Sequence, residues 1–397
     1  MDKKNITPNV PNLRFPYKGD WHKRKLNEIC LFFKGNGLSK SDLSNEGFPC
    51  ILYGELYTTY KNEVISDIVS KTTTTLSNPF LSKNNDLIIP GSGEDPIDIA
   101  VARAIYQNDI ILGGDLNVLR PKSNVSAAFL SYQLNGVRRY DIAKKAQGKS
   151  IVHLHNSDLK EVCVSIPTYD EQFHIVKLLT KIDEMIETQS KIISDYNSLK
   201  RGITQCIFNT SQQYSSVHLK VILKEISRKN KNRDNNNILS VSNSLGFIKQ
   251  SEQFEDREIA SSDTSNYKIV NKNEYAYNPA RINVGSIARL QNFDCGIVSP
   301  MYTIFTIDIS KITYEYFDLF LQSSTFQKQL SQKLEGSVRQ CLTFASMQNI
   351  LIKLPPLETQ IEISGKMKFI DSKIKLESDY LNLLQSEKNY LLKNLFI

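Results

Sequence analysis

Apolar residues recur at heptad spacing in two stretches of the chain, and both stretches predict long amphipathic helices. Residues 168–210 carry the first set: Ile175, Leu178, Ile182, Met185, Ile192, Tyr196, Leu199 and Ile203. Residues 356–397 carry the second: Ile363, Met367, Ile370, Ile374, Leu381, Leu384 and Leu391. A helix over 168–208 would be roughly 60 Å long. We predict that the two helices pair with each other, and packing of each helix on its own domain is the alternative.

The start of the first helix has its own signal. Pro167 is followed by Thr168-Tyr169-Asp170-Glu171, a pattern that predicts a capping box at the helix N-terminus. Glu358 lies in the corresponding part of the second stretch, without the same box.

The two helical stretches belong to a longer repeat. Four pairs of identical residues lie 188 positions apart: Gly148 and Gly336, Pro167 and Pro355, Gln172 and Gln360, and Phe208 and Phe396. No insertion or deletion interrupts this stretch, so the chain is a tandem duplication.

The segment before each long helix predicts a globular domain of mixed α/β type. Short β-rich runs are found at Cys50 to Tyr53, Leu87 to Ile89, Ile110 to Leu112 and Leu116 to Leu119, and a helix is predicted for Ala127 to Ala146. We predict an α+β fold with a pseudo-twofold tandem repeat. Its parts are an arm (1–20), a globular domain (21–167), a central long helix (168–210), a second globular domain (211–355) and a final long helix (356–397).

Composition narrows the class of protein. The chain has 397 residues, of which 40% are hydrophobic, enough for two or more domains. Lysine and arginine exceed aspartate and glutamate by seven, an excess that suits an anionic partner. The six cysteines lack metal-ligand spacing, and the sequence has neither a signal peptide pattern nor an apolar run of membrane-spanning length. We expect a soluble, cytoplasmic protein with reduced thiols.

Three short motifs resemble catalytic or ligand-binding sequences, and none is complete. Gly148-Lys149-Ser150 resembles the end of a P-loop, but the first glycine of that motif is replaced by Ala143. Asn278-Pro279-Ala280-Arg281 resembles the Asn-Pro-Pro-Tyr of adenine amino-methyltransferases without the aromatic residue that stacks a flipped base. Gly91-Ser92-Gly93 is interpreted as a turn. We therefore favour a binding protein with no catalytic site and no metal site.

Polar and aromatic residues in the predicted loops are the candidates for DNA contact. Arginine, lysine and asparagine can donate to base edges, and lysine, serine and threonine hold phosphates. A solvated surface position is the alternative for each. The candidates are Lys34, Asn36, Lys40, Tyr53, Tyr57, Thr58 and Arg103 in the first domain, and Arg228, Lys229, Asn243, Lys249, Arg281, Asn283 and Arg289 in the second.

The repeated junction adds four candidates. Gly148-Lys149-Ser150 and Gly336-Ser337-Val338-Arg339 sit at equivalent places, and each offers a cation and a hydroxyl on a glycine turn. We predict that Lys149, Ser150, Ser337 and Arg339 contact the same ligand, so that removal of either charge weakens binding and reduces its salt dependence.

These features together resemble the DNA specificity subunit of type I restriction-modification systems, over essentially the whole chain. The resemblance is carried by Leu13-Arg14-Phe15-Pro16, Gly19-Asp20-Trp21, Leu26-Asn27-Glu28-Ile29, Ile166-Pro167, Glu171-Gln172, Ile182-Asp183 and Leu354-Pro355-Pro356-Leu357-Glu358-Thr359-Gln360.

The resemblance implies two target-recognition domains, each reading one half of a split double-stranded DNA target. It implies two long antiparallel helices that set the gap and dock two modification subunits, and restriction subunits that complete an ATP-dependent nuclease. S-adenosylmethionine, ATP and Mg²⁺ are then expected on the partners, with no cofactor on this chain. Because the two domains differ in sequence, the target should not be palindromic.

Two points stay open at this stage. Lys366, Lys373 and Glu377 replace Leu178, Met185 and Gln189 in the second helix, so the two docking surfaces should differ. The alternative function is a non-catalytic scaffold whose paired domains bind protein.

Overall fold

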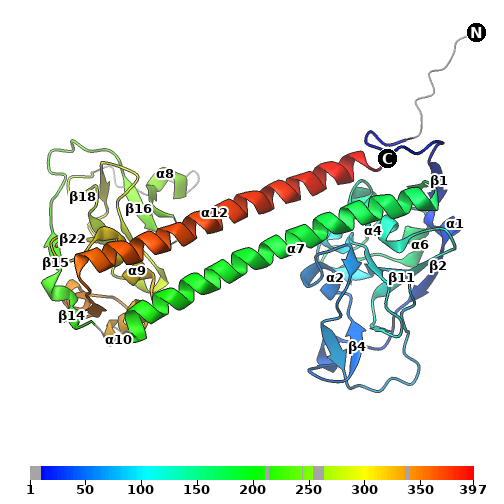
Figure 1. Ribbon diagram of the computed structural model, residues 1–397, viewed down its shortest axis with the longest axis horizontal. Coiled ribbons are helices and arrows are strands. Elements are labelled where there is room, and N and C mark those ends of the chain that lie inside the picture. The colour runs from blue at the N-terminus through cyan, green and yellow to red at the C-terminus, as the bar shows by residue number, and fades with distance from the viewer. Residues whose placement is uncertain (1–9, 211–213, 244, 254–262, 336–339) are drawn as a thin grey trace, which may run out of the picture. The chain divides into compact units, whose positions relative to one another are not determined.

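The protein divides into two compact units, each built partly from both long helices (Figure 1). The computed structural model describes residues 10–210, 214–243, 245–253, 263–335 and 340–397. The first unit comprises Met1–Lys191 and Ser378–Ile397, and the second comprises Ile192–Glu377. Helix α7 (Tyr169–Gln205) and helix α12 (Leu357–Asn394) therefore each contribute residues to both units. The predicted long helices are confirmed.

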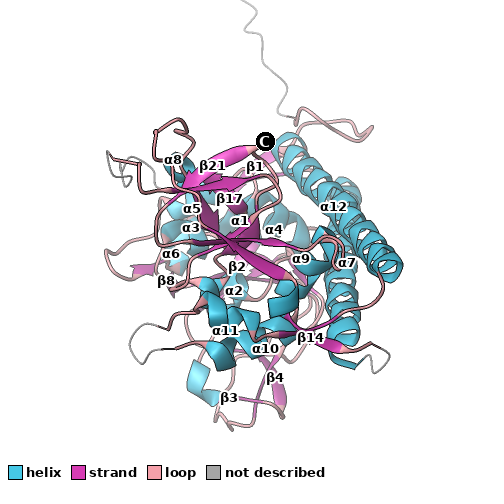
Figure 2. Ribbon diagram, turned by 90° about the vertical axis from the view of Figure 1, so that its left-hand side faces the viewer, coloured by secondary structure: helices cyan, strands magenta, loops and turns pink. Residues whose placement is uncertain are grey.

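The first unit is a mixture of short strands and helices (Figure 2). Its elements are β1 (His22–Lys25), α1 (Leu26–Ile29), β2 (Cys30–Lys34), η1 (Lys40–Asp42), β3 (Leu43–Ser44), β4 (Phe48–Ile51), α2 (Glu55–Thr58), β5 (Val64–Ile65), β6 (Ser70–Thr72), β7 (Asp86–Pro90), β8 (Ser92–Gly93), α3 (Pro96–Ile99), β9 (Arg103–Ile105), β10 (Ile111–Leu112), β11 (Leu116–Pro121), α4 (Ala127–Asn135), α5 (Arg139–Ala143), β12 (Val152–His153), α6 (Asn156–Lys160) and β13 (Cys163–Ile166). One sheet has the order β2-β11-β7-β9-β5, and another has the order β10-β4-β6-β3.

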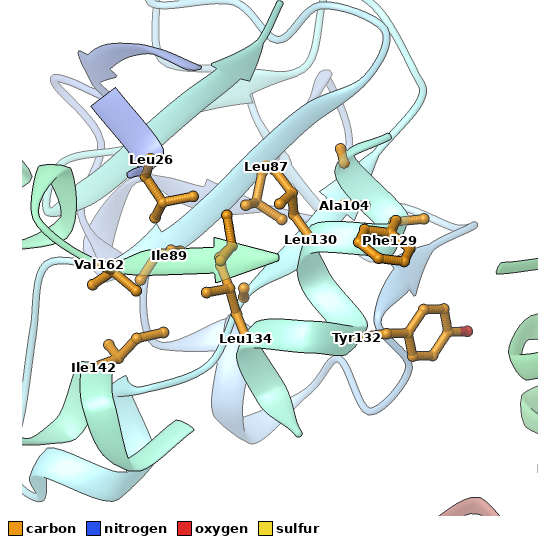
Figure 3. Close-up of a cluster of buried hydrophobic side chains, with 14 of the residues drawn as sticks. Leu26, Leu87, Ile89, Ala104, Phe129, Leu130, Tyr132, Leu134, Ile142 and Val162 are labelled. Carbon is orange, nitrogen blue, oxygen red and sulfur yellow. The ribbon is translucent and has the colours of Figure 1, made fainter. Parts of the chain in front are cut away.

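The main core of the first unit lies between the five-stranded sheet and α4. Every residue of β7 is buried, and all of α4 from Ala127 to Leu134 is buried as well. Figure 3 shows Leu130 and Leu134 of α4 lying among Leu87 and Ile89 of β7. Its two buried polar side chains are hydrogen-bonded, Ser131 to the Ala102 carbonyl and Gln133 to the Ser165 carbonyl, which allows α4 to lie deep in the unit.

The second unit repeats the plan of this sheet. Its elements are η2 (Cys206–Thr210), β14 (Ser216–His218), η3 (Leu219–Val221), β15 (Leu223–Ile226), β16 (Leu239–Ser242), β17 (Gly246–Lys249), α8 (Gln250–Gln253), β18 (Lys268–Asn271), β19 (Tyr275–Tyr277), η4 (Ile282–Val284), β20 (Ile287–Arg289), β21 (Cys295–Val298), β22 (Thr303–Ile307), α9 (Tyr314–Gln322), α10 (Ser324–Lys333), α11 (Phe344–Gln348) and β23 (Leu351–Lys353). The sheet order β15-β22-β19-β20 corresponds to β2-β11-β7-β9 in the first unit. The sequence duplication is therefore visible in the topology.

The two long helices run in opposite directions where they meet within each unit. In the first unit Asp183 of α7 lies 2.6 Å from Lys388 of α12, and Phe396, two residues past the end of α12, shares a core with the earlier α7 residue Ile175. In the second unit Lys200 of α7 lies 2.5 Å from Asp371 of α12. Numbering that rises on one helix as it falls on the other defines an antiparallel pair.

The ion pair of the first unit belongs to a larger buried cluster. Lys388 Nζ donates to Glu63 Oε2 at 2.7 Å and lies 2.6 Å from Asp183 Oδ1. The hydroxyl of Tyr132 on α4 donates to Asp183 Oδ2 at 2.7 Å. In Figure 3 this tyrosine points away from the apolar group around Leu130. The cluster thus joins the globular part of the unit to both long helices.

Three local predictions differ from the structure. The helix predicted for Ala127 to Ala146 is divided into α4 and α5 at Gly136, where an added Cβ would lie 3.0 Å from the Tyr132 carbonyl oxygen. The strand predicted at Cys50 to Tyr53 ends at Ile51, because Leu52 and Tyr53 lead directly into α2. The remaining predicted strands match β7, β10 and β11.

The third difference is the role of Glu171, which the sequence assigns to a capping box and the structure to contacts with the N-terminal arm. The Glu171 carboxylate accepts from Arg14 Nε at 2.7 Å and from Arg14 Nη2 at 2.8 Å, and Trp21 Nε1 donates to it at 3.2 Å. Glu171 therefore holds the N-terminal arm against α7. Within the described part of the chain, no helix is both long and apolar enough to span a membrane.

Candidate nucleic-acid interface

Three predicted residues of the first unit follow strand β2. Lys34 ends β2 and Lys40 opens η1, and both side chains are exposed. Asn36 lies between them and has a structural task, since its amide donates to the Asn78 carbonyl at 2.9 Å and accepts from the Phe80 backbone N–H at 2.9 Å. Asn36 therefore shapes the loop, whereas the two lysines offer charge to a ligand.

Tyr53, Tyr57 and Thr58 lie in and beside the short helix α2. Tyr53 and Tyr57 are half-buried, and burial raises the pKa of the Tyr57 phenol. Its hydroxyl would lie 3.6 Å from a Cβ added at Gly93, so Tyr57 reaches the strand β8. The Thr58 hydroxyl donates to the Gly54 carbonyl at 2.8 Å within the helix.

Arg103 is not available to DNA in this fold. Its side chain is buried, and its guanidinium donates to the carbonyl oxygens of Leu56, Tyr60 and Lys61 at 3.1, 2.9 and 3.2 Å. The donors on a buried guanidinium need acceptors, and α2 together with the chain that follows it supplies them. We therefore remove Arg103 from the set of proposed contacts.

The repeated junction forms a tight turn in the first unit. Gln147 and His153 exchange backbone hydrogen bonds of 2.9 and 2.7 Å, and Gly148 has a φ of +138°. A Cβ at Gly148 would lie 2.0 Å from the Ile151 carbonyl oxygen, so only glycine fits. Lys149 and Ser150 are exposed beyond it. Their predicted counterparts Ser337 and Arg339 lie outside the described residues.

The strand next to this turn changes the interpretation of one sequence motif. Gly91-Ser92-Gly93 is not a plain turn, because Ser92–Gly93 forms β8 and pairs with Val152–His153 of β12. The exposed Lys149 turn is therefore attached to the strand that Tyr57 reaches.

Two of the predicted arginines in the second unit are ion-paired. Arg228 is exposed and bridges to Glu274. Arg289 is tied by Nη2 to Asp318 Oδ2 at 2.7 Å, and its guanidinium lies 5.0 Å from the centre of the Tyr314 ring. Arg289 therefore connects β20 to α9. Lys229, which follows Arg228 in the chain, has an exposed side chain.

The other predicted residues of the second unit lie near the hairpin β16–β17. Asn243 follows β16 and Arg281 precedes η4, and both line a hollow of 470 Å³. Lys249 ends β17 and Asn283 lies in η4, and both are exposed. The structure therefore brings Asn243 and Arg281 to one surface.

Several residues of this surface were not predicted. Gln250 lines the 470 Å³ hollow, and the amides of Gln291, Asn292, Gln322 and Gln327 line a second hollow of 650 Å³. Uncharged amides far apart in sequence carry no pattern that links them. Within the described residues, no group of three histidine, cysteine, aspartate or glutamate side chains could hold a metal ion.

The predicted helix positions mostly face inward. The buried ones are Ile175, Ile182, Met367, Ile370, Leu384 and Leu391, and the half-buried ones are Leu178, Ile192, Tyr196, Ile203, Ile363, Ile374 and Leu381. Met185 and Leu199 are exposed, so helix pairing does not bury them, and subunit docking stays a prediction for both. The helices also pack on the globular cores, where Leu179 of α7 is buried in the first unit and Met367 of α12 in the second. Both alternatives for the helices, pairing and domain packing, are therefore realised.

One face of α12 exposes apolar side chains at regular spacing. Phe369, Leu376, Leu383 and Tyr390 recur every seven residues and are all exposed. We call these four residues the α12 stripe. Their counterparts 188 positions earlier on α7 are Lys181, Thr188, Asp195 and Gly202. An apolar heptad row on a helix surface is suited to contact with another helix.

Comparison with known sequences identifies relatives. The sequence profile of the type I restriction modification DNA specificity domain matches residues 18–195 and 220–386. The type I restriction enzyme MjaVIII specificity subunit of Methanocaldococcus jannaschii is 22% identical over 403 residues, covering 94% of this chain and 91% of the relative. An MjaX chain of that organism, assigned as a specificity subunit, is 30% identical over 113 residues, which is 26% of each chain.

Solved structures share the fold. The S subunit of a type I restriction-modification system from M. genitalium superposes with a TM-score of 0.61 at 17% identity, covering 98% of this chain and 99% of that chain. A chain from a study of complex assembly and conformational transition of the type I system superposes with a TM-score of 0.58 at 14% identity, covering 95% and 98%.

Proposed function

Because the chain belongs to the family of type I restriction-modification DNA specificity subunits, we propose that each of its two units reads one half of a bipartite DNA target. It is the non-catalytic specificity component of such a system and has two specificity domains. The observation that carries the proposal is the repeated sheet order, β2-β11-β7-β9 and β15-β22-β19-β20, in two units whose loops differ in sequence. Different loops on one framework should read different half-sites, so the target should not be palindromic.

The reading surfaces are proposed from the candidates that are exposed or half-buried. Lys34, Lys40 and Lys149 are the cations we assign to the first half-site, with Tyr53, Tyr57, Thr58 and Ser150 beside them. Lys229, Asn243, Lys249, Arg281 and Asn283 are assigned to the second, with Arg228 at the edge. Lysine contacts of this kind hold phosphates and position the protein, while base contacts specify the sequence. We propose recognition domains at 21–167 and 211–355, with the arm at 1–20.

The partners are proposed as two modification subunits and the restriction subunits. Subunits of this family carry no cofactor, and S-adenosylmethionine, ATP and Mg²⁺ are assigned to the partners. Complexes of this composition would act on DNA in the cytoplasm.

The helices are proposed to set the gap between the half-sites and to dock a modification subunit. The α12 stripe supports the docking proposal, since four exposed apolar side chains at heptad spacing are costly to leave in water. The polar counterparts on α7 imply that a second modification subunit would meet a different surface. The two partners should therefore bind with unequal affinity.

Genome-wide mapping of methylated adenine tests the proposed function. The chain is expressed with a type I modification subunit in a host without other methyltransferases, and the modified bases are located by long-read sequencing. We expect one motif with two fixed blocks that differ from each other, separated by a constant gap. A single continuous block, or no sequence-specific mark, would refute the proposal and favour a protein-binding scaffold.

A further inference from the structure

Two hollows lie beside the hairpin β16–β17 of the second unit. The smaller, of 470 Å³, is lined in part by Asn243, Gln250 and Arg281, and the larger, of 650 Å³, by Asn243 and Gln291. Asn243 lines both, so the end of β16 lies between them. Residues from β16, α8, the loop before η4 and the loop after β21 meet at the smaller hollow.

The backbone of Arg281 is held firmly at this hollow. Its N–H donates to the Asn278 carbonyl at 3.0 Å, and its carbonyl accepts from the N–H groups of Val284 and Ser286, each at 3.2 Å. The Ser286 hydroxyl in turn donates to the Val241 carbonyl of β16 at 3.2 Å. The arginine is therefore presented from a fixed turn that is bonded to the hairpin.

The guanidinium of Arg281 has no acidic partner among the described residues. The other described arginines on the globular surface of this unit are neutralised, as Arg228 is by Glu274 and Arg289 is by Asp318. Among the residues that the structure describes, no aspartate or glutamate lines the smaller hollow. A cation without a counter-charge gives the hollow a positive potential that attracts an anionic ligand.

Two further features of the hollow indicate a ligand. The Oε1 atom of Gln250 is buried and has no hydrogen-bond partner in the described part of the chain, which leaves its acceptor capacity unused there. Exposed apolar side chains surround the hairpin, with Met301 64%, Leu245 68% and Val284 52% accessible. Large apolar side chains beside unused polar groups mark a surface that meets a partner.

We propose that Arg281 is a specificity-determining residue that reads a guanine in the half-site of the second unit. The proposal rests on the proposed function and deepens it. The planar fork of arginine matches the O6 and N7 acceptors of guanine in the major groove, and a bidentate contact of this kind discriminates between bases. Asn243, on the same hollow, supplies an amide for the neighbouring base. A hollow with amide groups and an apolar rim fits base edges better than phosphates, which need only exposed cations.

Two substitutions at one position test the proposal. Arg281→Ala removes charge and fork, and Arg281→Lys keeps the charge and removes the fork. Lys328→Ala, at an exposed position on α10, removes one charge away from the hollow and serves as the control. Each full-length variant is expressed with the modification subunit, its folding is checked by thermal unfolding, and its methylated motif is mapped.

We expect both Arg281 variants to lose about tenfold to a hundredfold of the preference for guanine at one position of one half-site. The other half-site and the gap should be unchanged, and the control should keep the wild-type motif. If Arg281→Lys keeps the full preference, or if Arg281→Ala weakens modification of all sequences equally, Arg281 contacts a phosphate and the proposal is wrong. A wild-type chain without a two-block motif would instead refute the proposed function itself.

Discussion

Replacing Lys388 by methionine should destabilise the first unit much more than the same replacement at Lys200 destabilises the second. The two lysines lie 188 residues apart, and each meets an aspartate of the other long helix, at 2.6 Å from Asp183 and 2.5 Å from Asp371. They are therefore matched by the duplication and differ only in their surroundings. Methionine keeps the length of the side chain while removing its charge.

The surroundings set the magnitudes. The side chains of Lys388, Glu63 and Asp183 are 15%, 7% and 5% accessible, whereas those of Lys200 and Asp371 are 25% and 50% accessible. Removing one partner of a buried ion pair costs about 3–5 kcal/mol, because a charge is left buried without compensation. An exposed pair contributes about 0–1 kcal/mol. We expect the two variants to differ in unfolding free energy by about 3 kcal/mol.

Hydrogen exchange combined with chemical denaturation measures this difference. Exchange assigns the loss of stability to one unit, which a single unfolding transition of a two-unit protein does not do. Protection should fall around Glu63, Tyr132 and Asp183 in Lys388→Met and stay near wild type in the second unit of Lys200→Met. Equal losses in the two variants would refute the reasoning.

The pH dependence gives a second check on the same cluster. Burial raises the pKa of Asp183, and although burial opposes it, the charges of Glu63 and Asp183 raise the pKa of Lys388. A raised lysine pKa contributes stability that is complete below the unfolded value of 10.5 and is lost as pH rises through the folded value. Without Lys388, the pKa of Asp183 should rise further. As pH falls from 7 toward the folded pKa of Asp183, this carboxylate takes up a proton in Lys388→Met before it does so in the wild type. The loss of stability caused by Lys388→Met should therefore become smaller.

Three further experiments test other parts of the account. Phe396→Ala should lower the unfolding free energy of the first unit by about 3–5 kcal/mol, since the centre of its ring lies 5.3 Å from that of Phe129 and 6.3 Å from that of Trp21. Phe208→Ala should destabilise the second unit by a similar amount, because its ring packs on Tyr316. Hydrogen exchange shows which unit loses stability in each variant. Lys149→Ala should weaken DNA binding by the complex with the modification subunit and reduce its salt slope by about one; an unchanged slope would remove Lys149 from the interface. Leu383→Glu together with Tyr390→Glu should reduce co-purification of a modification subunit severalfold, whereas Asp195→Ala on α7 should not.

The long helices could be predicted from the sequence because heptad spacing is a local pattern that each helix carries along its own length. The heptad positions did not predict the packing of the helices fully, since Met185 occupies a heptad position and is exposed while Leu179 is buried. The sequence places a helix across Ala127 to Ala146, but the approach of Gly136 to the Tyr132 carbonyl is a feature of the folded turn.

The candidate site could be predicted only in part. Arg103, Arg281 and Arg289 all follow strand-like segments and look alike in the sequence. Their surroundings in the fold differ. Three carbonyl oxygens accept from Arg103, Asp318 pairs with Arg289, and no described acidic side chain pairs with Arg281. Such differences depend on contacts between segments that are far apart in the chain. The Lys388–Asp183 and Lys200–Asp371 pairs are visible in the sequence as a repeat, because the lysine and the aspartate each recur 188 residues apart.

Lengthening both long helices tests most directly the claim that two separate readers are held at a set distance. Seven residues are inserted between Lys191 and Ile192 in α7 and between Asp379 and Tyr380 in α12, positions 188 apart that keep the heptad phase. The insertion adds about 10 Å of helix, or about three base pairs of DNA. Mapping of methylated adenine should show both wild-type half-sites with the gap longer by about three base pairs. The same half-sites with an unchanged gap would contradict the account.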